Sequence, residues 1–180
     1  MKLTGLCLVS EAAELAAHRH SGQQRKGDEN EPYINHLAEV ASLLASATDG
    51  EDAELVAAGW LHDMIEDTDT SQDELVELFG ARVAGLVEEV TDDMTLAKSE
   101  RRRLQVIEAP KKSPGAKLIK IADKISNIRV RIFFEPDIEQ REELEDYLAW
   151  AAQVVDGCRG VNARLDALFD KTVADARHTL

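Results

Sequence analysis

Residues 55–68, LVAAGWLHDMIEDT, decide how this chain folds, because they join an apolar run directly to a cluster of ionisable side chains. The apolar part, residues 55–61, is typical of the end of a buried helix. An imidazole and three carboxylates follow it within six residues: His62, Asp63, Glu66 and Asp67. Charge is costly to bury unless it is paired or bound to metal, and residues spaced i,i+4 are helix neighbours. The pattern predicts one helix over about 52–67 whose end carries half of a metal site and acid–base groups beside it.

Apolar residues recur at helical spacing along the rest of the chain, and no alternating pattern persists long enough to predict a strand. A capping box formed by Ser71 and Glu74 predicts the start of one helix, and Gly80 predicts its end. We expect an all-α bundle of roughly eight to ten helices, folded as a single domain over residues 1–180. The expected helices cover about 11–20, 32–46, 52–67, 71–80, 81–90, 98–107, 116–131, 138–156 and 161 to the C-terminus.

Composition narrows the class of protein further. Hydrophobic residues make up 44% of the 180 residues, which argues against disorder, while the 4% of aromatic residues favours helices over sheets. The two cysteines, Cys7 and Cys158, fit no metal or redox motif, so a reducing cytoplasm is the expected location. Residues 3–9 are too short for the core of a signal peptide, and no stretch is long enough to span a membrane.

The charge is unevenly distributed along the chain. A net charge of −14 argues against nucleic-acid binding, which requires neutralisation of phosphates. Residues 98–131 nevertheless carry eleven Lys or Arg against three acids, a local balance of +8, which leaves −22 for the remainder. A basic stretch in an acidic chain suits a small polyanion rather than DNA, and a solvated basic face is the alternative.

Further candidate ligands lie outside the opening stretch. His36 stands at the start of the second expected helix, and Asp123 lies within an apolar helix with Asn127 on the same face. Two imidazoles and two carboxylates form a mixed nitrogen and oxygen donor set. Such a set favours Mn²⁺, Fe²⁺ or a related ion, whereas a structural zinc site is rich in thiolates. The alternatives are a capping or core histidine at residue 36 and a salt bridge between Asp123 and Lys120 or Lys124.

The order His, His-Asp and Asp on separate helices resembles the HD superfamily of metal-dependent phosphohydrolases. Within it, the chain is similar to the (p)ppGpp hydrolase domain of RelA/SpoT proteins, in the stand-alone form found in small alarmone hydrolases. This resemblance implies a single all-α HD domain and extends over about residues 8–165. The segments that carry it are QRK at 24–26, YINH at 33–36, LHDMIEDT at 61–68, FG at 79–80 and IKIADKISNIR at 119–129.

The resemblance implies a role for each of three groups of residues. One Mn²⁺ ion, with Fe²⁺, Co²⁺ or Zn²⁺ as substitutes, would be held by four ligands: His36, His62, Asp63 and Asp123. The catalytic pair, Glu66 and Asp67, would position and activate the attacking water. The third group would contact the nucleotide substrate: Arg25, Lys26, Tyr33, Lys98, Asn127 and Tyr147.

The implied reaction is hydrolysis of the 3′-pyrophosphate of ppGpp or pppGpp to GDP or GTP and pyrophosphate. A phosphatase for another nucleotide such as NADPH is the first alternative, because the segment after Arg129 departs from the family pattern. A nucleotide-binding regulator without catalysis is the second, although it predicts damage to a ligand set that is complete here. Tyr33 has the alternative role of a hydrophobic staple. No nucleic-acid or membrane partner is expected, and the oligomeric state is open, with a homodimer as one alternative.

Overall fold

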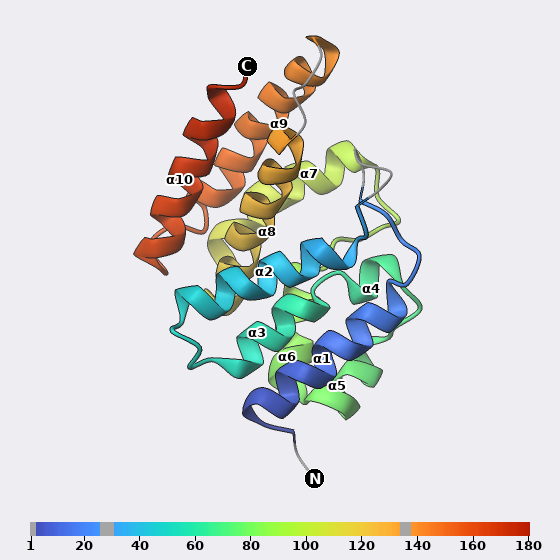
Figure 1. Ribbon diagram of the computed structural model, residues 1–180. Helices are drawn as coiled ribbons and strands as arrows, with labels where there is room; N and C mark the ends of the chain where they lie inside the picture. The colour runs from blue at the N-terminus through green and yellow to red at the C-terminus, as the bar shows by residue number, and fades with distance from the viewer. Residues whose placement is uncertain (1–2, 26–30, 134–137) are drawn as a thin grey trace. The chain divides into compact units, whose positions relative to one another are not determined.

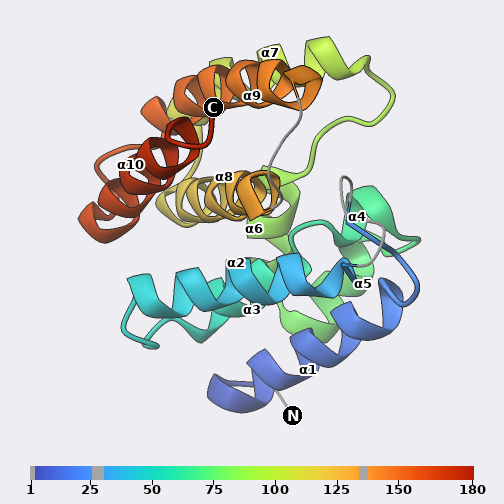
Figure 2. The ribbon, with the colours of Figure 1, turned by 45° about the horizontal axis from the view of Figure 1, so that its top comes forward.

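The computed structural model describes residues 3–25, 31–133 and 138–180. Within these ranges the regular structure is helical, apart from an isolated bridge between Gln24 and Pro32, which confirms the predicted all-α class. The helices group into two compact units, Met1–Asp92 and Asp93–Leu180, which we describe separately (Figures 1 and 2). The single domain expected over residues 1–180 stays a prediction.

The first unit is built around a short apolar helix, α3. This unit contains α1 (Gly5–Arg19), α2 (Ile34–Ala47), α3 (Ala53–Leu61), α4 (Met64–Asp67), α5 (Gln72–Phe79) and α6 (Ala81–Val90). Helix α3 packs against α1, α2 and α6, so residues 55–59 and Leu61 are buried (Figure 1). A Cβ atom on Gly59 would lie 2.5 Å from Leu44 Cδ1 and 3.3 Å from Ala41 Cα, so glycine allows α2 to approach closely.

The prediction of one continuous helix over about 52–67 is wrong in one respect. The segment forms two helices, α3 and α4, with a turn between them. Helix α3 ends at Leu61, and Asp63 has φ −100° and ψ 4°, which is outside the helical region. The last carbonyls of a helix lack backbone partners, and the Nδ1 atom of His62 bonds to one of them, Gly59 O, at 2.9 Å. The ionisable residues are therefore carried by a two-residue turn and the new helical turn that follows it.

Local capping signals fix both ends of α5, as predicted. The Ser71 hydroxyl accepts the Glu74 N–H at 3.2 Å, and Gly80, with φ 88°, ends α5. Helix α1 begins at Gly5, six residues before the expected start, and Leu8 extends the buried face of this helix by one turn beyond Ala12. Ser10, the residue before the expected start, therefore lies within the helix.

The second unit is built around a long helix, α8. It contains α7 (Lys98–Glu108), the 3-10 helix η1 (Ala109–Lys111), α8 (Pro114–Phe133), α9 (Ile138–Asp156) and α10 (Ala163–Arg177). Helix α8 packs against both α9 and α10 and buries five apolar residues of its middle turns: Ile119, Ile121, Ala122, Ile125 and Ile128 (Figure 2). It starts at a proline, which suits the first position of a helix because that position needs no N–H partner.

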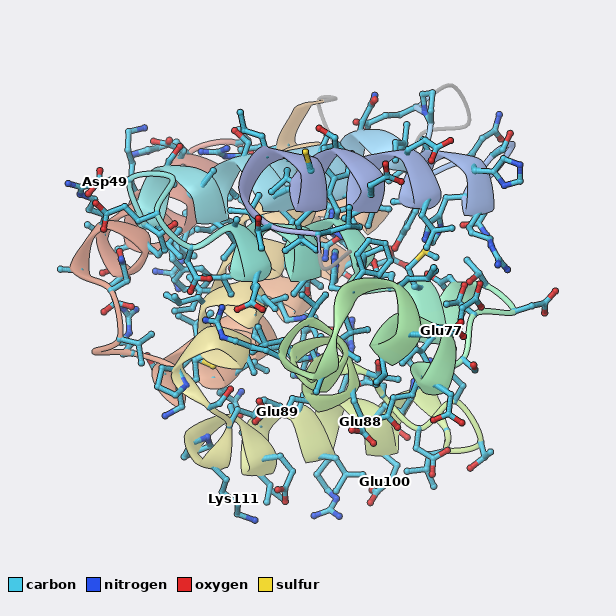
Figure 3. All side chains as sticks on the ribbon, turned by 90° about the horizontal axis from the view of Figure 1, so that it is seen from below. Asp49, Glu77, Glu88, Glu89, Glu100 and Lys111 are labelled. Atoms are coloured by element: carbon cyan, nitrogen blue, oxygen red, sulfur yellow. The ribbon has the colours of Figure 1, made fainter. Side chains whose placement is uncertain are left out.

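The two units differ strongly in charge. Residues 1–92 carry five Lys or Arg against twenty Asp or Glu, a net charge of −15, while residues 93–180 carry sixteen against fifteen, a net charge of +1. Glu77 of α5 and Glu88 of α6 are exposed on the acidic unit, and Lys111 is exposed on the other (Figure 3).

None of the helices in the described residues combines the length and the apolar character that crossing a membrane requires.

Candidate functional site

Three of the predicted metal ligands come together inside the first unit. His36 lies in the first turn of α2, His62 follows α3, and their rings meet edge-on with centroids 5.1 Å apart. The Asp63 Oδ2 atom lies 3.1 Å from His62 Nε2 and 3.5 Å from His36 Nε2. The side chains of His36, His62 and Asp63 are only 3%, 5% and 16% exposed. Two imidazoles and a carboxylate that converge in a buried place form a set able to hold a divalent metal ion.

The imidazoles influence the pKa of Asp63, and the proton position of one of them follows from its hydrogen bond. Burial on its own would raise the pKa of Asp63, but the imidazoles of His62 and His36 outweigh burial and hold that pKa well below its usual range. The contact of His62 Nδ1 with Gly59 O assigns the ring proton to Nδ1, because a carbonyl can only accept. A metal-binding histidine commonly donates its other N–H in this way, and the tautomer leaves Nε2 as the coordinating atom.

Arg25 lies behind the other imidazole. Its guanidinium group is 3.2 Å from His36 Nδ1 and 3.7 Å from the Glu31 carboxylate, and its side chain is 6% exposed. The structure therefore places Arg25 against a candidate metal ligand, a contact that the sequence did not predict. Its contact with the nucleotide substrate stays a prediction, and Lys26 lies outside the described residues.

The predicted catalytic pair lies on the single turn of α4, directly after the candidate ligands. Glu66 is half-buried, and its Oε1 atom accepts the backbone N–H of Asp92 from the segment after α6. Asp67 is exposed, and its backbone carbonyl accepts the Gln23 side-chain amide at 2.9 Å. Contacts from two distant parts of the unit, one from Gln23 and one from Asp92, therefore hold the turn that carries both carboxylates.

Tyr33 touches a candidate ligand directly. Its hydroxyl donates to Asp63 Oδ2 at 2.5 Å, and its ring stacks on His20 with the centroids 5.2 Å apart. This is the same oxygen that faces the two imidazoles, and a donor on a ligand carboxylate restricts the orientation of that carboxylate. No sequence pattern predicted this bond, because residues 33 and 63 meet only in the folded unit. The contact of Tyr33 with substrate stays a prediction.

The second unit contains Asp123, the remaining predicted ligand. Asn127, one helical turn later on α8, donates its Nδ2–H to Asp123 Oδ1 at 2.5 Å, as the i,i+4 spacing predicted. Lys124 Nζ lies 2.8 Å from the other carboxylate oxygen, so the salt bridge considered for this aspartate is also present. The Asp123 side chain is 14% exposed and that of Lys124 is 4% exposed.

Cations lie over aromatic rings beside Lys124. Tyr147 and Trp150 of α9 meet edge-on at 5.4 Å, with Lys124 Nζ 4.6 Å and Arg102 Cζ 4.8 Å from the centroid of Trp150. Arg131 lies 3.9 Å from the centroid of Tyr147, whose burial raises the pKa of its phenol. Such contacts hold cationic side chains in defined positions. Lys98, the other predicted substrate contact of this unit, is exposed at the start of α7.

Comparisons with known proteins identify the family to which the chain belongs. The model of the HD domain family matches residues 12–146, more than half of the chain, so the chain belongs to this family. The chain is 49% identical over 156 residues to guanosine-3′,5′-bis(diphosphate) 3′-pyrophosphohydrolase MESH1 of Homo sapiens, and the match covers 87% of each chain. It is 43% identical over 161 residues to the protein of the same name from Drosophila melanogaster, covering 89% of this chain and 90% of that one.

A solved structure supports the same assignment. A structure described as "A metazoan ortholog of SpoT hydrolyzes ppGpp and plays a role in starvation responses" matches 99% of both chains, with a TM-score of 0.87 and 39% identity. A second one, from Listeria monocytogenes, has a TM-score of 0.66 at 24% identity and supports the fold alone. The resemblance to stand-alone (p)ppGpp hydrolases that the sequence motifs predicted is therefore confirmed.

Proposed function

We propose that this protein hydrolyses the 3′-pyrophosphate ester of ppGpp or pppGpp and releases pyrophosphate with GDP or GTP. The observation that carries the proposal is the convergence of His36, His62 and Asp63 directly before the Glu66–Asp67 pair, in a chain of the HD family. Relatives named for this reaction, at 42–49% identity over most of the chain, support it. The substrate is a small nucleotide, which accords with the acidic net charge.

We propose Mn²⁺ as the ion, held by His36, His62, Asp63 and Asp123. A mixed set of imidazole and carboxylate donors without thiolates supports a first-row divalent ion of this kind. Fe²⁺, Co²⁺ and Zn²⁺ are the substitutes that the same donors would accept. When bound, such an ion lowers the pKa of a coordinated water and polarises a phosphoryl oxygen.

Glu66 and Asp67 would take up the proton that the attacking water loses. General bases in this role must stand within hydrogen-bond reach of the water, and α4 carries both carboxylates immediately after two of the proposed ligands. The Asp92 N–H supports this role for Glu66 because it restricts the orientation of the carboxylate. Positioning matters most in phosphoryl transfer, in which the protein contributes little covalent chemistry.

The second unit, which contains the basic stretch 98–131, would hold the phosphates of the substrate. Lys98, Asn127 and Tyr147 are the proposed contacts there, and Arg25, Lys26 and Tyr33 are those of the first unit. The excess of Lys and Arg over residues 98–131 supports this division, because a concentrated positive field attracts a small polyanion. A planar guanidinium group such as that of Arg25 suits stacking on a base.

We also propose a reducing, cytoplasmic location. Among the described residues Cys7 is an exposed free thiol and Cys158 a buried one, which supports this location. A homodimer stays an alternative to a monomer, and light scattering on the purified chain would decide between them.

Incubation of the purified protein with ppGpp and Mn²⁺ tests the proposal. The expected result is release of pyrophosphate and GDP in equal amounts, faster than phosphate release from NADPH under the same conditions. No turnover of ppGpp by protein with one metal ion bound per chain would overturn it. Turnover of NADPH alone would support the alternative phosphatase.

A further inference from the structure

Three polar residues at the end of α1 and just before α2 form a group of which the proposed function uses only Tyr33, as a substrate contact. We call His20, Gln23 and Tyr33 the polar bracket. His20 is 2% exposed, its Nδ1 atom lies 2.8 Å from Gln23 Oε1, and its ring stacks on that of Tyr33 with an angle of 30° between the planes. Side chains from two segments of the first unit are thus connected through one buried imidazole.

The polar bracket reaches the candidate site at two points. Tyr33 donates its O–H to Asp63 Oδ2 at 2.5 Å, and Gln23 donates its Nε2–H to the backbone carbonyl of Asp67 at 2.9 Å. One contact holds a proposed metal ligand, and the other holds the main chain of a proposed catalytic acid. His20 lies behind both contacts, because it touches Gln23 and Tyr33 alike.

The hydrogen-bond directions within the polar bracket follow from the donor and acceptor types. Since Gln23 Nε2 donates to a carbonyl, Gln23 Oε1 must accept, and His20 Nδ1 must carry the proton that it accepts. His20 Nε2 is buried and has no hydrogen-bond partner among the described residues. A buried polar atom without a partner is unfavourable, and an apolar residue would fill the same place without that penalty. The Nδ1–H bond is therefore the reason for an imidazole at this position.

The main chain supports the polar bracket independently of its side chains. The Tyr33 N–H donates to Gln23 O at 2.9 Å, and the Gln23 N–H donates to His20 O at 3.0 Å. These backbone bonds do not depend on the side chains of His20 or Gln23. Substitutions at His20 and Gln23 should therefore leave the local path of the chain in place.

We propose that His20 and Gln23 are positioning residues of the metal centre, acting on Asp63 through Tyr33 and on Asp67 through its backbone carbonyl. The inference rests on the proposed function in taking Asp63 as a metal ligand and Asp67 as part of the acid pair. Partners of metal ligands that lie one contact further out commonly change metal affinity or activity by about 10–100-fold when they are removed. In this role the polar bracket controls the angle of the Asp63 carboxylate and the position of the Asp67 main chain.

Metal affinity measured by competition with a fluorescent chelator of Mn²⁺ tests this role without reference to turnover. Gln23→Ala and His20→Phe should weaken Mn²⁺ binding by about 10-fold, and Tyr33→Phe by at least as much. Ser21→Ala is the matched control, because Ser21 is exposed in the same segment and should bind Mn²⁺ as the unmodified protein does. The kcat for ppGpp should fall in Gln23→Ala while KM stays within about twofold, because Gln23 touches the acid pair and not the substrate.

A purely structural role makes different predictions. If Gln23→Ala and His20→Phe retain the Mn²⁺ affinity of the unmodified protein, the inference is overturned. Should His20→Phe fail to fold, Gln23→Glu decides the matter, because it keeps the acceptor for His20 and removes the donor to Asp67. Gln23→Glu with unchanged metal affinity and unchanged kcat would also overturn the inference. Absence of ppGpp turnover in the unmodified protein would contradict the proposed function, whereas these differences in Mn²⁺ affinity concern the positioning role alone.

Discussion

The two units of this protein hold their charged side chains in place by different means. The first unit, with a net charge of −15, fixes its acids with N–H and O–H donors: Tyr33 on Asp63 and the Asp92 backbone on Glu66. The second unit, with a net charge of +1, fixes its cations over aromatic rings, as for Arg131 on Tyr147. The difference accords with the proposed division of tasks, in which the first unit carries three of the four proposed metal ligands and the acid pair, and the second contacts the phosphates.

Two carboxylates sharpen the same contrast. Asp63 lies beside the imidazoles of His62 and His36, whereas Asp123 already has an ammonium partner in Lys124. An ion that binds Asp63 therefore has two imidazoles beside it as further candidate ligands. An ion that binds Asp123 shares the carboxylate with a lysine. We therefore expect the first unit to dominate metal affinity.

The largest expected effect comes from Asp63→Ala. Loss of a metal ligand should abolish Mn²⁺ binding and lower kcat/KM by at least about 10³-fold, because the water and the phosphoryl group lose their activating ion. The fold should persist, since the buried apolar residues around α3 do not involve this side chain. Metal analysis, turnover and circular dichroism check the three parts. Asp69→Ala, an exposed acid in the same stretch, is the control, and turnover retained in Asp63→Ala would break the site assignment.

Glu66→Gln should have the next largest effect. The variant keeps the size and the hydrogen-bond acceptor for Asp92 but removes the base, so kcat should fall by about 10²–10⁴-fold while Mn²⁺ stays bound. Single-turnover kinetics with metal-loaded protein measure the chemical step directly. Loss of Mn²⁺ together with activity would show that Glu66 belongs to the ligand set instead.

Lys98→Ala tests the task assigned to the second unit. Removing one cation from the phosphate contacts should raise KM for ppGpp by about 10-fold with little change in kcat or in metal affinity. The effect should shrink at high salt, because the charge is exposed and screened. Lys171→Ala, an exposed lysine paired with Asp175 in the same unit, should leave KM unchanged. A fall in kcat for Lys98→Ala as large as the expected rise in KM would mean that this lysine stabilises the transition state and not only the bound substrate.

Substitution at Gly59 addresses the packing that supports the ligands. A methyl group there would meet Leu44 and the backbone of Ala41, so Gly59→Ala should cost roughly 1–3 kcal/mol of unfolding free energy. Chemical denaturation measures that loss. Gly85→Ala is the matched control, because a Cβ there meets nothing within 4 Å, and it should not destabilise the protein. Equal stability of the two variants would contradict the close approach of α2 and α3.

The smallest expected effect concerns pH. Arg82 holds the pKa of Asp52 below its usual 3.8, so the pair stabilises the folded state above the unfolded pKa and loses this contribution as pH falls. The pair is partly exposed, so Arg82→Ala should cost at most about 1 kcal/mol at pH 7. The difference from the unmodified protein should narrow as pH falls below about 4. A difference that grows on acidification would contradict this account.

The helices and the candidate ligands were predictable from the sequence because their signals are local. Periodic apolar residues, the Ser71 cap and the glycine at 80 act within a few residues, and the structure confirms them. The turn between α3 and α4 was not predictable, since it depends on a side-chain bond from His62 to its own helix end. The contacts of Tyr33 with Asp63 and of Gln23 with Asp67 join residues 30 and 44 positions apart. Nothing in either local segment specifies such a partner.

One measurement tests the central claim most directly: ppGpp hydrolysis by the same preparation before metal removal, after chelation and after Mn²⁺ is restored. The account predicts pyrophosphate and GDP in equal amounts at the start, almost none after chelation, and recovery with about one ion per chain. Hydrolysis that continues unchanged in chelated protein with no detectable metal would contradict the claim, as would an inactive preparation that holds its metal.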